Sequence, residues 1–164
     1  MSIRPLAFTA LFVALGVILG HLVYIPIGVA KCFPMQHAIN VLLAALLGTR
    51  YAVSGAFTIS LLRNLLGTGS LLAFPGSLCG AFLAGWLFRR TGHIAGAVAG
   101  EIIGTGLIGG LLAYPVASWF LGSQVGAFFF IIPFLISTTG GSLIAYVLYR
   151  TPLTMVLQKR LSSH

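Results

Sequence analysis

Residues Leu6–Val23 read LAFTALFVALGVILGHLV, an apolar run in which Thr9 and His21 are the polar residues. A helix of this length is long enough to cross the hydrocarbon core of a bilayer. Arg4 precedes the run, as a basic residue precedes the apolar part of a signal peptide, but no convincing small-x-small cleavage site follows it. Because further apolar spans come after it, we interpret this stretch as a retained first transmembrane helix.

The rest of the chain is equally apolar. Of its 164 residues, 59% are hydrophobic and 6% are charged, and the mean hydropathy is +1.08. A soluble fold of this size cannot bury so much apolar surface, so most of it must face lipid. The sequence therefore predicts an all-α integral membrane protein with six transmembrane helices in a single membrane domain, residues 1–164. The expected spans are residues 6–23, 35–47, 51–66, 71–88, 94–115 and 125–149.

Proline and glycine predict where these helices are interrupted. Residues 24–34 carry two prolines and a glycine, which oppose a continuous helix. The span that follows, residues 35–47, is shorter than the roughly 17 residues that cross a bilayer unaided. The segment Phe74-Pro75-Gly76-Ser77 predicts a break inside the fourth span. Broken helices at membrane depth are tolerated where they line a cavity, and their free backbone groups can bind a ligand.

Basic residues predict the orientation of the chain. Seven of the nine Lys and Arg residues fall beside span ends that can be placed on one side of the membrane. Because cytoplasmic loops collect Lys and Arg, we expect both termini to be cytoplasmic. The seven residues are Arg4, Arg50, Arg89, Arg90, Arg150, Lys159 and Arg160.

Three charges have no such topological explanation. Lys31 and Arg63 fall on or near the opposite side, and Glu101, the only acid in the chain, lies inside the fifth span. Ionisable residues inside membrane segments are costly and tend to mark functional sites.

Several classes of function are not expected. The cations are scattered and do not form a basic stripe with interleaved aromatic residues, so nucleic acid is not an expected partner. The longest loop has about a dozen residues, which leaves no room for a soluble ATPase domain, so energy must come from a partner or an ion gradient. The chain has no Asp, and its four histidines lack metal-ligand spacing, so we expect no enzyme, no metal and no cofactor. The two cysteines, Cys32 and Cys79, are expected to be unpaired thiols.

The start of the second span is the densest candidate for a ligand site. Gln36 and Asn40 are four residues apart on one helix surface, and His37 lies beside them. Phe128-Phe129-Phe130 and Trp119 are predicted at the same outer level, where they either form the walls of a small-molecule pocket or belong to an ordinary aromatic belt.

Glu101 and Arg63 are the expected pair of opposite charges in the membrane. An isolated carboxylate there should be neutral, paired with a cation or bonded to a ligand. Arg63 is the expected protein partner, although Glu101 is predicted to lie deeper, and the alternative is that Arg63 extends to the outer headgroups. Glycines at four-residue spacing, Gly96, Gly100 and Gly104, indicate close helix packing inside the protein more than a dimer interface.

The candidate ligand-binding residues share polarity or aromaticity and a place at the outer side. They are Lys31, Phe33, Gln36, His37, Asn40, Arg63, Asn64, Phe74, Ser77, Glu101, Thr105, Trp119 and Phe129.

A stripe of small residues lies on the cytoplasmic half of the first span. Ala7, Ala10 and Ala14 share one helix face, which can seat another helix closely. From the spacing alone, packing inside the protein is the favoured interpretation.

Four polar-bearing blocks, in order along the chain, resemble a known family. The blocks are residues 24–40 (YIPIGVAKCFPMQHAIN), 60–69 (SLLRNLLGTG), 73–77 (AFPGS) and 100–106 (GEIIGTG). With the Ala10-Leu-Phe-Val-Ala14 segment, they are similar to an S component of an energy-coupling factor (ECF) vitamin transporter, and most closely to the thiazole-specific ThiW family. The resemblance covers nearly the whole chain.

The resemblance implies a function and a set of partners. It implies a plasma-membrane protein of a prokaryote that takes up the thiazole precursor of thiamine, hydroxyethylthiazole. It also implies that the alanine face docks, as the family's small-residue pattern does, on an ECF coupling transmembrane protein driven by two ABC ATPases. The open alternatives are an S component for hydroxymethylpyrimidine or thiamine, a self-sufficient carrier with Glu101 as its proton site, and a membrane scaffold assembled through the span-five glycines.

Overall fold

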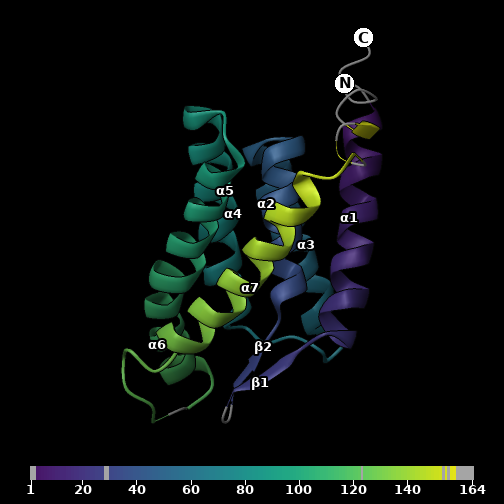
Figure 1. Ribbon diagram of the computed structural model, residues 1–164. Coiled ribbons are helices and arrows are strands. Elements are labelled where there is room, and N and C mark those ends of the chain that lie inside the picture. The colour runs from purple at the N-terminus through teal and green to yellow at the C-terminus, as the bar shows by residue number, and fades with distance from the viewer. Residues whose placement is uncertain (1–2, 28–29, 123, 153, 155, 158–164) are drawn as a thin grey trace.

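The computed structural model describes residues 3–27, 30–122, 124–152, 154 and 156–157. Within these residues the chain forms a helical bundle with one short hairpin at its end (Figure 1). The strands are β1 (Ile25–Ile27) and β2 (Ala30–Cys32), which pair antiparallel. The helices are α1 (Ile3–Leu22), α2 (Pro34–Leu46), α3 (Thr49–Leu65), α4 (Ala73–Thr91), α5 (Ile94–Glu101), the π-helix η1 (Ile102–Gly109), α6 (Gly110–Phe120) and α7 (Ile131–Tyr149).

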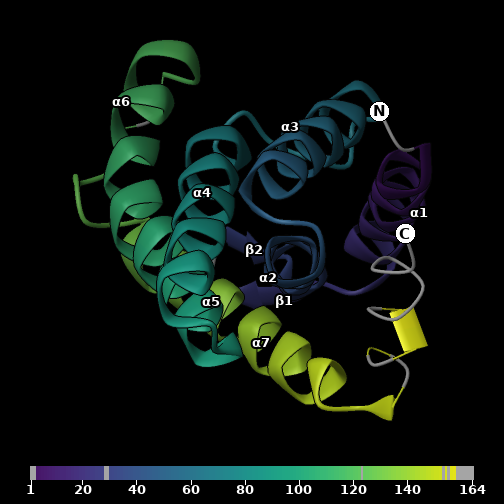
Figure 2. The ribbon, with the colours of Figure 1, turned by 90° about the horizontal axis from the view of Figure 1, so that it is seen from above.

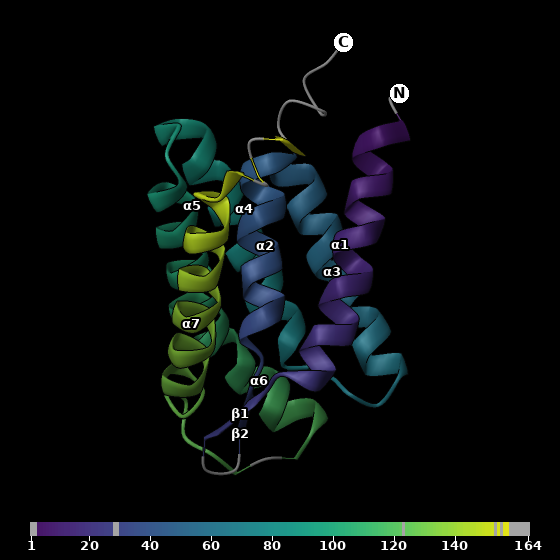
Figure 3. The same ribbon diagram turned by 45° about the vertical axis from the view of Figure 1, so that its right-hand side comes forward.

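The helices run up and down as six rods, because α5, η1 and α6 follow one another without a break (Figures 1 and 3). In the described part of the chain, three rods are long and apolar enough to cross a membrane by length and composition: α1, α5–η1–α6 and α7. The predicted all-α membrane architecture is confirmed. The β1–β2 hairpin occupies the interruption predicted between the first two spans.

Helix α2 is the central element of the bundle. Seen from above, the other rods surround it (Figure 2), and it packs against α1, α3, α4, α5 and α7. Its residues Asn40, Val41 and Leu43 have no exposed surface. Helix α2 has only 13 residues, fewer than a helix needs to cross a bilayer unaided. This length is tolerated because protein, rather than lipid, covers most of the helix.

The predicted break in the fourth span is wrong. Helix α4 begins at Ala73, so Phe74, Pro75 and Gly76 form its first turn. Proline is tolerated there because the first N–H groups of a helix have no intrahelical partner to lose. The irregular helix is instead η1 in the fifth rod, where no proline marks the change.

Two other boundaries also differ from the prediction. The fifth rod continues to Phe120 rather than ending near residue 115, so Trp119 is helical and does not lie in a corner. The last helix begins at Ile131, about a turn and a half later than the predicted residue 125. The apolar residues 125–130 look like helix in the sequence, but Phe128–Phe130 form a turn.

The glycine stripe of the fifth rod packs inside the protein, as expected. A Cβ added to Gly104 would lie 2.6 Å from the Cys79 carbonyl oxygen of α4, and one on Gly100 would overlap the backbone of Leu83. The backbones of α4 and the fifth rod therefore approach closely, which brings the side chains of Glu101 and Thr105 to α4.

Basic residues gather at the end of the bundle where α1 begins. Arg50 opens α3, Arg89 and Arg90 close α4, and Arg150 follows α7. Arg63 lies toward the opposite end, near the hairpin. Lys159 and Arg160 are outside the described residues. The charge pattern predicted this segregation, in which these basic residues lie at one end of the bundle and the hairpin lies at the other.

Candidate ligand-binding site

A cavity of about 750 Å³ lies at the hairpin end of the bundle. Its walls come from the end of α1, β2, α2, the α3–α4 connection, the start of α4, η1, α6 and the start of α7. This volume is within the range of pockets that enclose small molecules. The elements that meet there are far apart in sequence, so the cavity is a product of the bundle as a whole.

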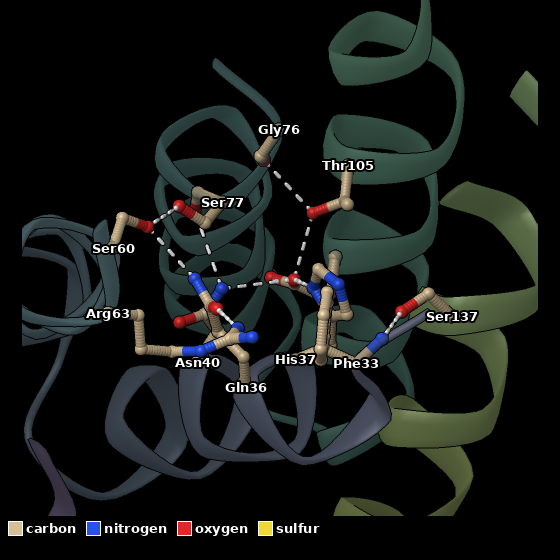
Figure 4. Close-up of polar contacts among 11 residues, drawn as sticks. Phe33, Gln36, His37, Asn40, Ser60, Arg63, Gly76, Ser77, Thr105 and Ser137 are labelled. Carbon is tan, nitrogen blue, oxygen red and sulfur yellow. Dashed lines mark hydrogen bonds and ion pairs between the residues drawn. The ribbon is translucent and has the colours of Figure 1, made fainter. Parts of the chain in front are cut away.

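One polar chain connects α2, α3 and α4 beside the cavity (Figure 4). The Gln36 amide donates to Ser60 Oγ at 2.9 Å, and Ser60 Oγ lies 2.9 Å from Ser77 Oγ. Asn40 Nδ2 lies 3.4 Å from the Ser77 carbonyl oxygen. Buried polar groups are costly unless hydrogen-bonded, so these hydrogen bonds hold the three helices in one register.

Glu101 is the centre of a second cluster. It is fully buried, and its Oε1 lies 2.9 Å from His37 Nδ1, 3.1 Å from Asn40 Nδ2 and 2.9 Å from Thr105 Oγ1. The Thr105 hydroxyl is also 3.0 Å from the Gly76 carbonyl oxygen, so its single proton goes to one of the two acceptors. Among the described residues, Glu101 Oε2 has no hydrogen-bond partner.

The expected ion pair between Arg63 and Glu101 is wrong. The partner of Glu101 is His37, whose Nδ1 lies 2.9 Å from Glu101 Oε1. Arg63 is nearer the hairpin, as its position at the end of α3 requires, and Glu101 lies deeper. The expected difference in depth was therefore correct, and it is the reason that the two side chains do not meet.

Arg63 is buried and held by uncharged partners. Its Nη1 donates to Gln36 Oε1 at 2.7 Å and its Nη2 to the Thr68 carbonyl oxygen at 3.0 Å. The guanidinium carbon lies 3.9 Å from the centre of the Phe33 ring, a cation–π contact. Its Nε has no partner among the described residues and faces Gly20 of α1. The guanidinium of α3 therefore contacts Phe33, α2 and the α3–α4 connection beside α1, and it does not extend to lipid headgroups.

Aromatic rings form the apolar side of the cavity. Phe129 and Phe130 meet edge to face with ring centres 5.2 Å apart, and Phe134 packs against Phe130 at 6.3 Å. Trp119, by contrast, is 81% exposed and lies away from the cavity. The difference arises because α6 extends as a helix through Trp119 and turns that side chain outward.

The predicted site residues whose side chains are described fall into three groups. Those that line the cavity are Phe33, Gln36, His37, Arg63, Ser77, Thr105 and Phe129. Those that lie behind it, bonded to lining residues, are Asn40 and Glu101. Those that do not line it are Asn64, Phe74 and Trp119.

The residues of the last group have other contacts. Asn64 Nδ2 donates to the carbonyl oxygens of Ser60 and Ser70, and so ties down the α3–α4 connection. The ring of Phe74 packs on Phe57, with centres 5.8 Å apart. Lys31 has its backbone in β2, and its side chain is outside the described residues.

Some lining residues were not predicted. They are His21, residues 67–70, Leu72, Phe134 and Ser137, among others. The polar turn Gly67-Thr68-Gly69-Ser70 was a visible signal, because it is more polar than a helix end needs. Ser137 had no such signal, since a lone serine in an apolar helix is common, yet its Oγ accepts a hydrogen bond from the Phe33 N–H at 2.8 Å.

The alanine face of α1 is exposed. Ala7, Ala10 and Ala14 are open to the surroundings, whereas the buried face of α1 consists of Thr9, Val13, Gly16 and Gly20. Packing inside the protein, which the spacing alone favoured, is therefore wrong for these alanines. Cys32 and Cys79 are both free thiols.

Comparison with known proteins identifies the family. Residues 6–154 match the family described as “Thiamine-precursor transporter protein (ThiW)”. No curated protein matches the chain. No solved structure matches it either. The match covers most of the chain, including every helix that lines the cavity, and it describes a family of transporters. The chain therefore belongs to the ThiW family of thiamine-precursor transporter proteins.

Proposed function

We propose that this chain is the ligand-binding S component of an ECF-type importer and that it captures hydroxyethylthiazole, the thiazole precursor of thiamine. The observation that carries the proposal is the cavity at the hairpin end, which combines aromatic walls with a small set of fixed polar groups. This combination is typical of sites that bind a small ring compound.

The charge of the lining favours a precursor over thiamine. Among the described lining residues, Arg63 is the permanent charge, and it is positive. The only acid of the chain, Glu101, is fully buried behind His37 and Thr105. Thiamine carries a permanent positive charge on its thiazolium ring, which Arg63 would repel. The neutral thiazole avoids this repulsion. Its ring nitrogen can accept a hydrogen bond from an Arg63 N–H group that has no partner among the described residues.

The neutral pyrimidine precursor also avoids the repulsion, so charge alone does not choose between the two precursors. The preference for thiazole follows from the four sequence blocks that resemble the thiazole-specific family. All four blocks supply cavity residues, which are Phe33, Gln36 and His37 from the first, Arg63 from the second, Ser77 from the third and Thr105 from the last.

The basic end of the bundle provides the orientation. Because Arg50, Arg89, Arg90 and Arg150 gather there, it is the cytoplasmic end under the positive-inside rule. The cavity then faces the outside of a prokaryotic plasma membrane, where a nutrient is captured. The exposed face of Ala7, Ala10 and Ala14 lies in the cytoplasmic half of α1, and it docks on the ECF coupling transmembrane protein, which two ABC ATPases drive.

Calorimetric titration of the purified protein in detergent tests the ligand. Hydroxyethylthiazole, hydroxymethylpyrimidine and thiamine are titrated separately into protein whose folding is verified by a cooperative thermal transition. Selective binding of the thiazole is expected. Selective binding of either other compound would contradict the substrate but keep the cavity as the site, and binding of none would contradict the proposal.

A second candidate function is a self-sufficient proton-coupled carrier. The observation that favours it is the buried carboxylate of Glu101, with Oε2 unpartnered among the described residues and His37 beside it. Proton-driven uptake by the isolated chain would support this candidate, whereas the S component requires the coupling module.

A further inference from the structure

We propose that His37 determines the specificity of the site: its Nε2 accepts a hydrogen bond from the hydroxyl group of the bound precursor. The inference rests on the proposed function, because it assigns a role within that same cavity. It starts from the geometry around Glu101, which fixes which nitrogen of the His37 ring carries the proton.

Glu101 Oε1 acts as a hydrogen-bond acceptor. Asn40 Nδ2, which can only donate, lies 3.1 Å from it, and the Thr105 hydroxyl at 2.9 Å is placed to donate as well. His37 Nδ1 lies 2.9 Å from the same oxygen. Two acceptors would repel each other at this distance, so Nδ1 carries the hydrogen and donates it to Glu101.

The proton on Nδ1 decides what the other nitrogen can do. In a neutral imidazole with Nδ1–H, Nε2 has a lone pair and no hydrogen, so it is an acceptor only. Nε2 lies across the ring from Nδ1 and therefore points away from Glu101. No partner for Nε2 is found among the described residues, and His37 lines the cavity with 11% of its side chain exposed. The lone pair is thus available to a ligand in the cavity.

An acceptor at this place selects for a ligand that donates. The precursor hydroxyl can donate to Nε2, while a fluorine in its place can only accept weakly and would leave Nε2 without a partner. The carboxylate of Glu101 strengthens the acceptor by polarising the ring and locks the ring orientation, as carboxylates do for the histidines that they support. Glu101 is therefore a positioning residue, and His37 is the one that touches the ligand.

A pair of ligands and a pair of variants test this assignment. The ligands are hydroxyethylthiazole and its 2-fluoroethyl analogue, which is nearly the same size but has no donor. In His37→Asn, the amide nitrogen replaces Nδ1 and keeps the bond to Glu101, but no atom replaces Nε2. In His37→Gln, the amide oxygen can reach the position of Nε2, while the bond to Glu101 is lost.

The unaltered protein should bind the alcohol at least about tenfold more tightly than the fluoride, since a site built around a hydroxyl rejects the analogue without it. In His37→Asn the two affinities should agree within about twofold, and His37→Gln should recover part of the difference. Equal binding of alcohol and fluoride by the unaltered protein, or an unchanged preference in His37→Asn, would overturn the role of His37 and leave the proposed function standing. Failure of the unaltered protein to bind any thiazole would overturn both.

The tautomer gives a readout that needs no ligand. In protein labelled with ¹⁵N-histidine, the two ring nitrogens of a neutral His37 have distinct chemical shifts, and His37→Asn assigns the signals by their loss. A protonated Nδ1 with a bare Nε2 is the expected result. An Nε2–H tautomer, or an imidazolium at neutral pH, would overturn the inference even if the thiazole binds.

Discussion

Two helix faces of this protein reverse the usual rule for soluble proteins. On α2, the polar side chains of Gln36 and Asn40 are buried in the middle of the bundle. On α1, the small apolar side chains of Ala7, Ala10 and Ala14 are exposed. In lipid, exposed apolar groups cost little, whereas buried polar groups must be hydrogen-bonded. Under the proposed function, the buried face of α2 serves ligand binding and the exposed face of α1 serves coupling.

The largest effect is expected from a change at the buried polar cluster beside α2. Glu101→Leu leaves the Asn40 amide and His37 Nδ1 without their shared acceptor, each of which costs about 1–3 kcal/mol when buried. Ligand affinity should fall at least about 30-fold, because the two lost bonds together cost about 2–6 kcal/mol and each 1.4 kcal/mol is about a factor of ten. Calorimetry and a thermal melt measure the two effects.

Two further variants control for misfolding. Glu101→Gln keeps an acceptor oxygen and should retain a folded protein with a smaller loss of affinity. Ser142→Ala removes a buried hydroxyl that has no partner among the described residues, so it should change neither affinity nor stability appreciably. If Glu101→Leu bound the thiazole as the unaltered protein does, the buried cluster would have no part in the site.

The next largest effect is expected from a change at the exposed alanine face of α1. Replacing Ala10 and Ala14 together by Trp fills the exposed face that a partner helix would contact. Uptake in cells should fall at least about tenfold, while the dissociation constant of the purified protein should change by less than about twofold, because the alanines are remote from the cavity.

Leu15→Trp is the matched control for this prediction. Leu15 is 40% exposed on the same helix, but it lies on the other flank of the buried stripe. Its substitution should leave uptake intact. Equal loss from both substitutions, or joint loss of binding and uptake, would contradict a division between the two faces.

A smaller effect sharpens the role of charge at the cavity. Arg63→Gln removes the positive charge but keeps an amide donor near Gln36 and Thr68. The affinity for hydroxyethylthiazole should fall about tenfold, since the Phe33 contact and a charged donor are lost. The affinity for thiamine should fall less or rise, because its cation is no longer repelled. A parallel loss for both ligands, measured by competition calorimetry, would show that Arg63 does not discriminate by charge.

The smallest effect tests how tightly α1 is fitted to this arginine. A Cβ on Gly20 would lie 3.2 Å from Arg63 Nε, so Gly20→Ala must shift the guanidinium slightly. We expect a loss of about two- to threefold in thiazole affinity, within the range of small packing changes. Gly126→Ala, where an added Cβ meets nothing within 4 Å, is the control and should bind normally. Equal affinities for the two variants would mean that the packing of Gly20 against Arg63 does not constrain the position of the guanidinium.

The sequence was sufficient for the rods and for much of the site. Apolar length predicted the helices, and the Gln36–Asn40 pair predicted a polar face on α2 because four-residue spacing is fixed by helix geometry. The continuous start of α4 was missed, because a proline does not reveal whether it lies in the first turn or the interior. The π-helix was missed because no proline marks it. The partner of Glu101 was also missed. The sequence favoured the permanently charged Arg63 as the partner of the acid, whereas in the folded protein His37 lies at the same depth as Glu101 and within hydrogen-bond distance of it. The exposure of the alanine face depends on where the neighbouring helices lie, which spacing alone does not determine.

Transport in proteoliposomes tests the central claim most directly. Labelled hydroxyethylthiazole is offered to vesicles that contain this chain alone, or the chain with an ECF coupling protein and its two ABC ATPases, with and without ATP and with and without a proton gradient. The account predicts uptake only when the coupling module and ATP are both present, and loss of that uptake in the Ala10→Trp, Ala14→Trp double variant. Uptake by the chain alone, driven by the proton gradient and abolished by Glu101→Gln, would contradict it.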